Sequence, residues 1–211
     1  MNASREQEPD ARDRILRAAA DLFYRDGILA TGVDGLIERA NVAKATFYRH
    51  FPSKEHLVLA WLRGPDARWI EWVVPELERR AESPLRRLVL FWDVLGDWLE
   101  EHGFVGCPFL NSLVEIRDPD APARREIESY VGEVEDYFRR TAAAARLPKP
   151  EELGRRLRYI AMGLFMAVRV ERSRAPVETA RAAAIDVLAI WMEVTPQEVK
   201  TRVAPSRNDL V

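Results

Sequence analysis

The sequence predicts an all-α protein, and three observations support this fold class. Apolar residues recur at intervals of three and four along most of the chain, as on the buried stripe of a helix. Alternating β-branched runs bounded by hairpin turns, the signature of strands, are nearly absent. Proline-containing breaks such as Asp118-Pro119-Asp120 separate the helical stretches. With 211 residues, 47% of them hydrophobic, the chain can bury a sizeable core in one or two domains.

The N-terminal elements are expected in the order lead, helix and helix-turn-helix. Residues 1–11 are polar and predict a disordered lead without a secretory signal. The first helix follows, and Gly27 is expected to stop it. A short helix is expected at 33–40 and another from about Lys44. Asn41 suits the tight turn between them, because its short polar side chain tolerates a left-handed backbone.

The segment 41–51 is the most informative, because its two helical faces differ. Phe47 and Phe51 recur at helical spacing and can face a small core. Placing Phe47 inward points Ala45 and Arg49 outward, at about 100° per residue. The outer face then offers cations, hydroxyl groups and a methyl group, which suit phosphates and base edges in a groove of DNA. Taken alone, such a short helix is more often a plain solvated helix.

A wider pattern surrounds this helix and includes the run YRHFPSKEHLV at 48–58. Its residues are Ala18, Ala19, Leu22, Phe23, Gly27, Thr31, Val33, Asp34, Ala40, Val42, Lys44, Thr46, Tyr48, His50, Phe51, Ser53, Lys54 and Leu57. In this order and spacing, residues 14–62 closely resemble the DNA-binding domain of the tetracycline-repressor (TetR) family of transcriptional regulators. One departure is Ala43, which stands where the family often has a Ser N-cap and costs the helix about 1 kcal/mol of local support.

The resemblance implies a DNA-binding head at 12–53 and a helical body at 54–203 that dimerises and binds a small-molecule effector. The protein would then be a repressor that the effector releases from a palindromic double-stranded operator. By the same resemblance, the residues facing the major groove would be Lys44, Ala45, Thr46, Tyr48 and Arg49. Those near phosphates would be Thr31, Tyr48, His50 and Lys54.

The body is expected to contain further helices separated by prolines and glycines. Ser53 offers an N-cap to a fourth helix that would run to about Trp72, ahead of Pro75, with a kink or break at Gly64-Pro65. An ordinary helix end followed by a new helix is the alternative. Later helices are predicted at 84–101, 108–116, 121–145, 151–172 and 176–192, with a disordered tail at 204–211.

The last two long helices carry wide apolar stripes that need a partner surface. The family resemblance makes these stripes the interface of a homodimer, and the alternative is that they cap the chain's own core. The predicted interface residues are Leu157, Leu164, Phe165, Val168, Ala184, Val187, Leu188 and Trp191.

Aromatic residues and methionines concentrate in the middle of the body, where family analogy places an effector pocket. Plain core packing is the competing interpretation. A thiol just before a helix that starts at Pro108 could have a lowered pKa and sense electrophiles, although a lone cysteine is usually buried and inert. The predicted pocket residues are Trp92, Cys107, Phe109, Tyr130, Met162 and Met166.

Composition limits the other functional classes. Net charge is only −2, so the positive charge must be local, and residues 40–54 contain three cations and no acid. A single cysteine fits a reducing cytoplasm, and no run approaches the ~18 apolar residues of a membrane span. The sequence contains no glycine-rich phosphate-binding loop and no zinc-binding His-Glu-x-x-His helix. It therefore predicts no enzyme, no cofactor and no metal site. The alternatives are a constitutive or thiol-sensing repressor, and a helical enzyme or interaction module with a vestigial head.

Overall fold

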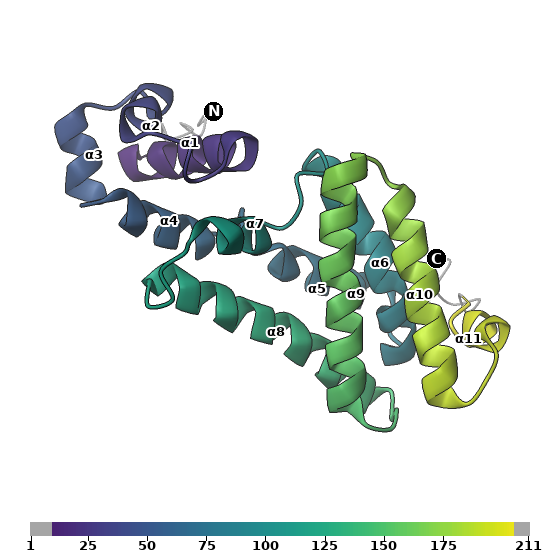
Figure 1. The fold of residues 1–211 in the computed structure, drawn as a ribbon. Helices are drawn as coiled ribbons and strands as arrows, with labels where there is room; N and C mark the ends of the chain where they lie inside the picture. The colour runs from purple at the N-terminus through teal and green to yellow at the C-terminus, as the bar shows by residue number, and fades with distance from the viewer. Residues whose placement is uncertain (1–9, 205–211) are drawn as a thin grey trace, which may run out of the picture. The chain divides into compact units, whose positions relative to one another are not determined.

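A computed structural model describes residues 10–204, and these residues form eleven α-helices and no strand (Figure 1). The predicted all-α class is therefore confirmed. The predicted lead and tail fall almost wholly outside the described residues. The helices are α1 (Ala11–Asp26), α2 (Val33–Ala40), α3 (Lys44–His50), α4 (Lys54–Leu62), α5 (Trp69–Arg80), α6 (Pro84–Glu101), α7 (Pro108–Glu115), α8 (Pro122–Ala144), α9 (Pro150–Glu171), α10 (Ala175–Met192) and α11 (Pro196–Arg202).

The helices pack into two compact units. The first unit contains the chain up to Ala67 together with Asn111–Ile127, and the second contains Arg68–Leu110 together with the chain from Glu128 onward. The dividing points fall within α7 and α8, so each of these helices contributes residues to both units. The predicted division into a head and a body at residues 53 and 54 is a functional one and stays a prediction.

The first unit is built around the packing of α1 against α2, α3 and α4. Ile15, Leu36 and Phe47 are fully buried in its core. The turn between α2 and α3 is made by Asn41, whose φ of 50° and ψ of 57° confirm the predicted left-handed conformation. The helix that follows has Ala43 as its N-cap and receives no side-chain cap bond there, as the sequence predicted.

The fourth helix ends earlier than predicted. Ser53 caps the start of α4 by accepting a hydrogen bond from the backbone N–H of His56 at 3.4 Å, as expected. The helix stops at Leu62, and the Gly64 N–H bonds to the Trp61 carbonyl at 2.9 Å. The helix therefore does not reach Trp72, and the predicted alternative of an ordinary helix end followed by a new helix is confirmed. The helical conformation is unfavourable for the residue before a proline, which agrees with a break at Gly64-Pro65. The new helix α5 instead runs through Pro75, which was expected to lie beyond the helix end.

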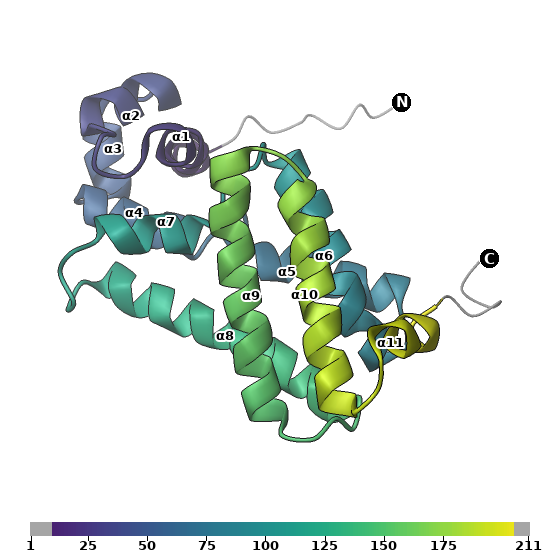
Figure 2. The same ribbon diagram turned by 45° about the vertical axis from the view of Figure 1, so that its right-hand side comes forward.

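The second unit centres on the antiparallel helices α9 and α10, which lie side by side in Figures 1 and 2. Helix α10 also packs on α6, where a Cβ added to Gly96 would lie 2.9 Å from a methyl group of Val177. Arg174 bridges Asp97 at 2.7 Å and Glu100 at 2.8 Å. These contacts fix α10 against α6 through both a close backbone approach and charge pairs.

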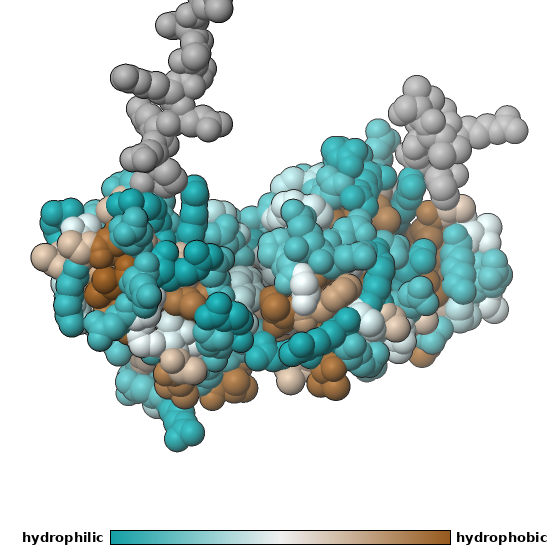
Figure 3. Space-filling model, turned by 90° about the horizontal axis from the view of Figure 1, so that it is seen from above, coloured by the Kyte–Doolittle hydropathy of each residue, from teal (hydrophilic) through white to brown (hydrophobic). Residues whose placement is uncertain are grey.

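Helix α11 was missed from the sequence. Thr195 caps its start, and Glu198 completes a capping box by accepting the Thr195 backbone N–H at 2.8 Å. The pattern Thr-Pro-Gln-Glu at residues 195–198 is a recognisable signal for such a helix start. The helices α6 to α10 begin and end within one residue of their predicted bounds. Among residues 10–204 no helix is long and apolar enough to span a membrane. The face of the molecule shown in Figure 3 is mostly hydrophilic, with small apolar patches.

Two glycines test the close approach of α8 and α9 in the second unit. A Cβ on Gly154 would lie 2.9 Å from the Arg139 backbone nitrogen, whereas one on Gly132 would meet nothing within 4 Å. We expect Gly154→Ala to lower the free energy of unfolding by about 1–3 kcal/mol, because backbone cannot move aside easily. Gly132→Ala should raise it by up to about 1 kcal/mol through helix propensity. Urea denaturation measures both, and equal effects of the two substitutions would contradict the described packing.

Candidate DNA-binding surface and ligand cavity

Helix α3 is held in place mainly by one side chain. A seven-residue helix is too short to be stable alone in water, so its position depends on tertiary packing. Phe47 is 0% exposed, and its ring lies 6.3 Å from that of Phe51, which is also buried. Tyr48 packs edge-on against Phe47 with ring centroids 5.4 Å apart. The buried Phe47 therefore fixes which face of α3 meets the solvent.

The exposed face of α3 is the one predicted from the sequence. Lys44, Ala45, Tyr48 and Arg49 are exposed, and the Tyr48 ring is 43% exposed despite its contact with Phe47. Thr46 is half-buried on the flank, as is His50 at the end of the helix. The structure thus brings six of the eight predicted DNA-contacting residues onto one short helix. A seventh, Lys54, is half-buried in the first turn of α4.

The charge on this surface is positive and accessible. Arg49 has no ion pair among the residues that the structure describes. Lys44 pairs with Asp34 at 3.3 Å, but both side chains are largely exposed. Exposed pairs of this kind contribute at most about 1 kcal/mol, so a DNA phosphate can compete for the ammonium group. The surface therefore offers two cations and a phenol to a polyanion.

Thr31 is the one predicted phosphate contact that the structure contradicts. Its side chain is buried, with 5% exposure, and its hydroxyl donates a hydrogen bond to the Gly27 carbonyl at 2.7 Å. The hydroxyl therefore closes the turn between α1 and α2 and has no proton free for a phosphate. Gly27 begins this turn with a φ of 89°, a conformation that glycine adopts without steric cost.

A small cavity lies within the second unit, with a volume of about 20 Å³. Cys107, Tyr130 and Met162 line it, as predicted. This volume holds roughly one water molecule, far below the several hundred Å³ of typical ligand pockets. A larger ligand would have to displace side chains. The lining residues that the sequence did not identify are Trp69, Leu110, Val131, Val134, Arg158, Ala161 and Phe165.

The other three predicted pocket residues lie elsewhere. Trp92 is fully buried in the core, where its indole N–H donates to the Leu88 carbonyl at 3.1 Å. Phe109 stacks on the Tyr130 ring at 3.7 Å and does not reach the cavity. Met166 is 55% exposed. These three assignments need correction, because helical spacing does not reveal which side of a helix faces a cavity.

Polar groups at the cavity are few. The Tyr130 hydroxyl accepts a hydrogen bond from the Ile70 backbone N–H at 2.9 Å, and burial raises its pKa well above the ordinary value. The Trp69 indole N–H is buried and makes no hydrogen bond within the described part of the chain. Arg158 reaches the Met162 sulfur at 3.2 Å and pairs with Glu135 at 2.8 Å. A ligand in an opened cavity would therefore meet an unused donor and an arginine.

The Cys107 thiol is buried and has a raised pKa, which confirms the interpretation of an inert cysteine over that of a thiol activated at a helix start. The thiol is buried, with 4% exposure, and loss of hydration raises its pKa above the ordinary value. Backbone N–H groups at the start of α7 and the nearby Trp69 indole favour the thiolate, but they oppose this effect only in part. The thiol is thus protonated at neutral pH and weakly nucleophilic.

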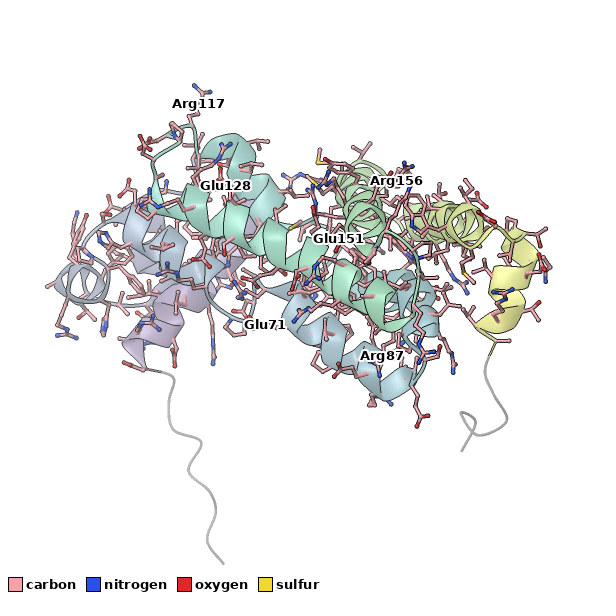
Figure 4. All side chains as sticks on the ribbon, turned by 90° about the horizontal axis from the view of Figure 1, so that it is seen from below. Glu71, Arg87, Arg117, Glu128, Glu151 and Arg156 are labelled. Carbon is pink, nitrogen blue, oxygen red and sulfur yellow. The ribbon has the colours of Figure 1, made fainter. Side chains whose placement is uncertain are left out.

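The residues predicted for the dimer interface mostly face the interior of their own subunit. Six are buried with at most 3% exposure, namely Leu157, Leu164, Phe165, Val168, Ala184 and Leu188. Val187 is half-buried, as is Trp191, whose indole N–H donates to the Pro148 carbonyl at 2.7 Å. Trp191 also lies under the guanidinium of Arg156, labelled in Figure 4. These residues leave little surface for a second copy, so the predicted dimer face needs correction.

Within residues 10–204, no group of three or more His, Cys, Asp or Glu could hold a metal ion.

Comparisons with known proteins agree with this arrangement. The profile described as "Bacterial regulatory proteins, tetR family" matches residues 15–61, and that described as "Tetracyclin repressor-like, C-terminal domain" matches residues 84–184. A solved structure titled as SCO4454, a TetR-family transcriptional regulator from Streptomyces coelicolor, superposes with a TM-score of 0.79 at 28% identity, covering 86% of this chain and 95% of that one.

Two curated relatives are also regulators by name. The transcriptional repressor NemR of Escherichia coli is 22% identical over 190 residues, which cover 86% of this chain and 96% of that protein. An uncharacterised HTH-type transcriptional regulator of Lactococcus lactis is 26% identical over 128 residues. That match covers 60% of this chain and 65% of the relative, just under two thirds of its length.

The reactivity of Cys107 tests the description of the cavity. Because the chain has one cysteine, alkylation by iodoacetamide reports on this thiol alone. At pH 8 we expect the native protein to react at least about tenfold more slowly than the denatured chain, since the thiol is buried and protonated. Mass spectrometry over time measures both rates. Equal rates would mean that the thiol is accessible and activated, and would support the alternative of a thiol sensor.

Proposed function

The chain belongs to the tetR family of bacterial regulatory proteins and is a DNA-binding transcriptional regulator, and from this premise we propose that it is a repressor that a small molecule releases from a palindromic operator. The observation that carries this proposal is the exposed face of α3. Phe47 anchors the helix from behind, while Lys44, Tyr48 and Arg49 stand on the outside. A protein with this function works in the cytoplasm, where the chromosome lies.

The roles of the α3 residues follow from their chemistry. Arg49 is free to reach the O6 and N7 atoms of a guanine, and the Ala45 methyl group suits a thymine methyl. Tyr48 and the cation of Lys54 suit phosphate oxygens, which position the helix without reading sequence. His50, half-buried at the end of α3, is a further phosphate contact by family resemblance. Because net charge is only −2, this local surface has to supply the attraction to DNA.

A homodimer would place two copies of α3 in successive major grooves, about 34 Å apart on one face of the duplex. For the dimer we propose a face of α9 and α10 different from the one predicted. Tyr159, Met166 and Val170 on α9 are more than half exposed, as is Ile190 on α10. Between the two helices runs a shallow groove lined by small residues that include Gly163, Ala167 and Ala183. An exposed apolar stripe beside such a groove supports a self-complementary contact.

The effector is proposed to enter the cavity lined by Trp69, Cys107 and Tyr130. Because the closed cavity has room for about one water, binding requires that the surrounding helices separate. Helix α7 begins at this cavity, and such a movement would change its position. Coupling between effector and operator of about 1–3 kcal/mol is typical, and each ligand must weaken the other's binding by the same factor.

A selection of genomic DNA fragments by the purified protein tests the proposal. We expect one palindromic motif, because a two-fold dimer reads two equal half-sites. Tyr48→Ala should abolish the enrichment, since it removes a phosphate contact while Phe47 still anchors the helix. Arg49→Ala should instead bind with relaxed preference at one position of each half-site.

The matched control is Trp72→Ala, which removes a partly exposed aromatic side chain from α5, outside the proposed DNA-binding and dimer faces. It should leave the preferred half-site sequence unchanged. Absence of any enriched motif would contradict the proposed reader. Recovery of a motif without two-fold symmetry would contradict the dimer and leave DNA recognition by α3 intact.

A further inference from the structure

A groove of about 380 Å³ lies within the first unit and shares no residue with the cavity described above. Its volume falls within the range of small-molecule sites, roughly 300–1,000 Å³. The walls are apolar and come from three segments that are distant in sequence. They include Ile28 from the turn after α1, Val58 and Leu59 from α4, and Ile116 and Pro122 around the loop between α7 and α8.

Charged side chains also line this groove, and acids predominate at what is here called its acidic rim. Glu55, Glu115 and Asp118 give −3, and Lys54 gives +1, so these four side chains sum to −2. Arg117 belongs to the same loop, but it does not line the groove, and its side chain points outward in Figure 4. An apolar groove with an acidic rim is complementary to a molecule that has an apolar body and one cationic group.

Glu115 connects this rim to the DNA-binding head. Its carboxylate accepts a hydrogen bond from the Leu29 backbone N–H at 2.6 Å. The same carboxylate would lie 3.0 Å from a Cβ at Gly27, so it is packed against the backbone of the turn between α1 and α2. Because this turn leads directly into α2, Glu115 helps to fix where the helix-turn-helix begins.

A cation in the groove would compete for this carboxylate. A charged donor makes a stronger hydrogen bond to a carboxylate than a neutral backbone N–H does. Occupation of the groove would therefore weaken the bond to Leu29 and loosen the turn before α2. The side chain of Lys54, a proposed phosphate contact, lines the same groove and would be repelled by the bound cation.

We propose that this groove is a second ligand site, for molecules with an apolar body and one cationic group, and that Glu115 transmits its occupation to the DNA-binding head. The site is separate from the proposed effector cavity. The expected effect on operator affinity rests on the proposed DNA-binding function of the head, whereas binding of the ligand to the groove does not. Bound ligand is expected to lower operator affinity.

Binding is tested by isothermal titration calorimetry with octylammonium, octanoate and octan-1-ol, which share one apolar chain and differ in charge. We expect octylammonium to bind the full-length protein at least about tenfold more tightly than either of the others. Glu115→Gln and Asp118→Asn should each weaken octylammonium several-fold. Gln at 115 can still accept the Leu29 N–H, so the fold is retained while the charge is lost. Glu101→Gln removes an exposed charge from α6 and should change nothing.

Two filling variants locate the bound molecule. Ala121→Trp adds bulk at the groove, and Ala161→Phe adds bulk at the cavity of the second unit. We expect Ala121→Trp to abolish octylammonium binding and Ala161→Phe to leave it unchanged. The reverse pattern would place the ligand in the effector cavity and overturn the second site. Equal affinities for octylammonium, octanoate and octan-1-ol would overturn the preference for a cation.

The coupling to DNA is measured with the selected operator, by fluorescence anisotropy with and without octylammonium. Ethylammonium at the same concentration controls for competition of a small cation with the protein for phosphates. We expect octylammonium alone to weaken operator binding, and operator to weaken octylammonium binding by the same factor. In Glu115→Gln this mutual effect should become smaller at ligand saturation, because only the repulsion between the bound cation and Lys54 remains. Octylammonium binding without any change in operator affinity would contradict the role of Glu115, whereas the absence of a selectable operator would contradict only the proposed reader.

Discussion

The burial of Phe47 is the constraint on which the DNA-reading surface depends. Helix α3 has only seven residues and cannot hold its own conformation, so the fully buried ring fixes its rotation. The left-handed turn at Asn41 sets the direction in which the helix leaves α2. Together they place Arg49 outward. The chain as a whole is slightly acidic. The burial of Phe47 and the turn at Asn41 nevertheless place the cations of α3 on one exposed face, so the positive charge of the site is local.

Residues whose role follows from local periodicity could be predicted from the sequence. The rotation of α3 and the bounds of most helices are of this kind, since an apolar stripe and a proline or glycine determine them. Roles that depend on where a side chain points within the folded protein could not be predicted. Thr31 has the hydroxyl of a phosphate contact, but it points into the turn and bonds Gly27. Helix α9 is apolar around more than one face, so the pattern could not tell Leu164, which is buried, from Met166, which is exposed.

Both proposed ligand sites would act on the head through α7. The small cavity is lined by Leu110 of α7 and by Cys107 just before it, and the groove is lined by the last residue of α7, Glu115. One continuous helix thus carries side chains at both sites, and its final carboxylate bonds the turn that precedes α2 at 2.6 Å. Displacement of α7 from either end would reach the same hydrogen bond. Because the Glu115 carboxylate lies beside Gly27, there is little room for a side chain at that position.

Site-directed cleavage of operator DNA tests the central claim most directly. The single buried cysteine is replaced in Cys107→Ser, and Ala45→Cys then carries an iron chelate that cuts DNA nearby, because Ala45 is exposed on α3. The account predicts cleavage in the major groove at two positions about one helical turn apart. Ala182→Cys, exposed on α10, should give no cleavage above background. Absence of cleavage from Ala45→Cys in a variant that still binds the operator would show that another surface reads the DNA.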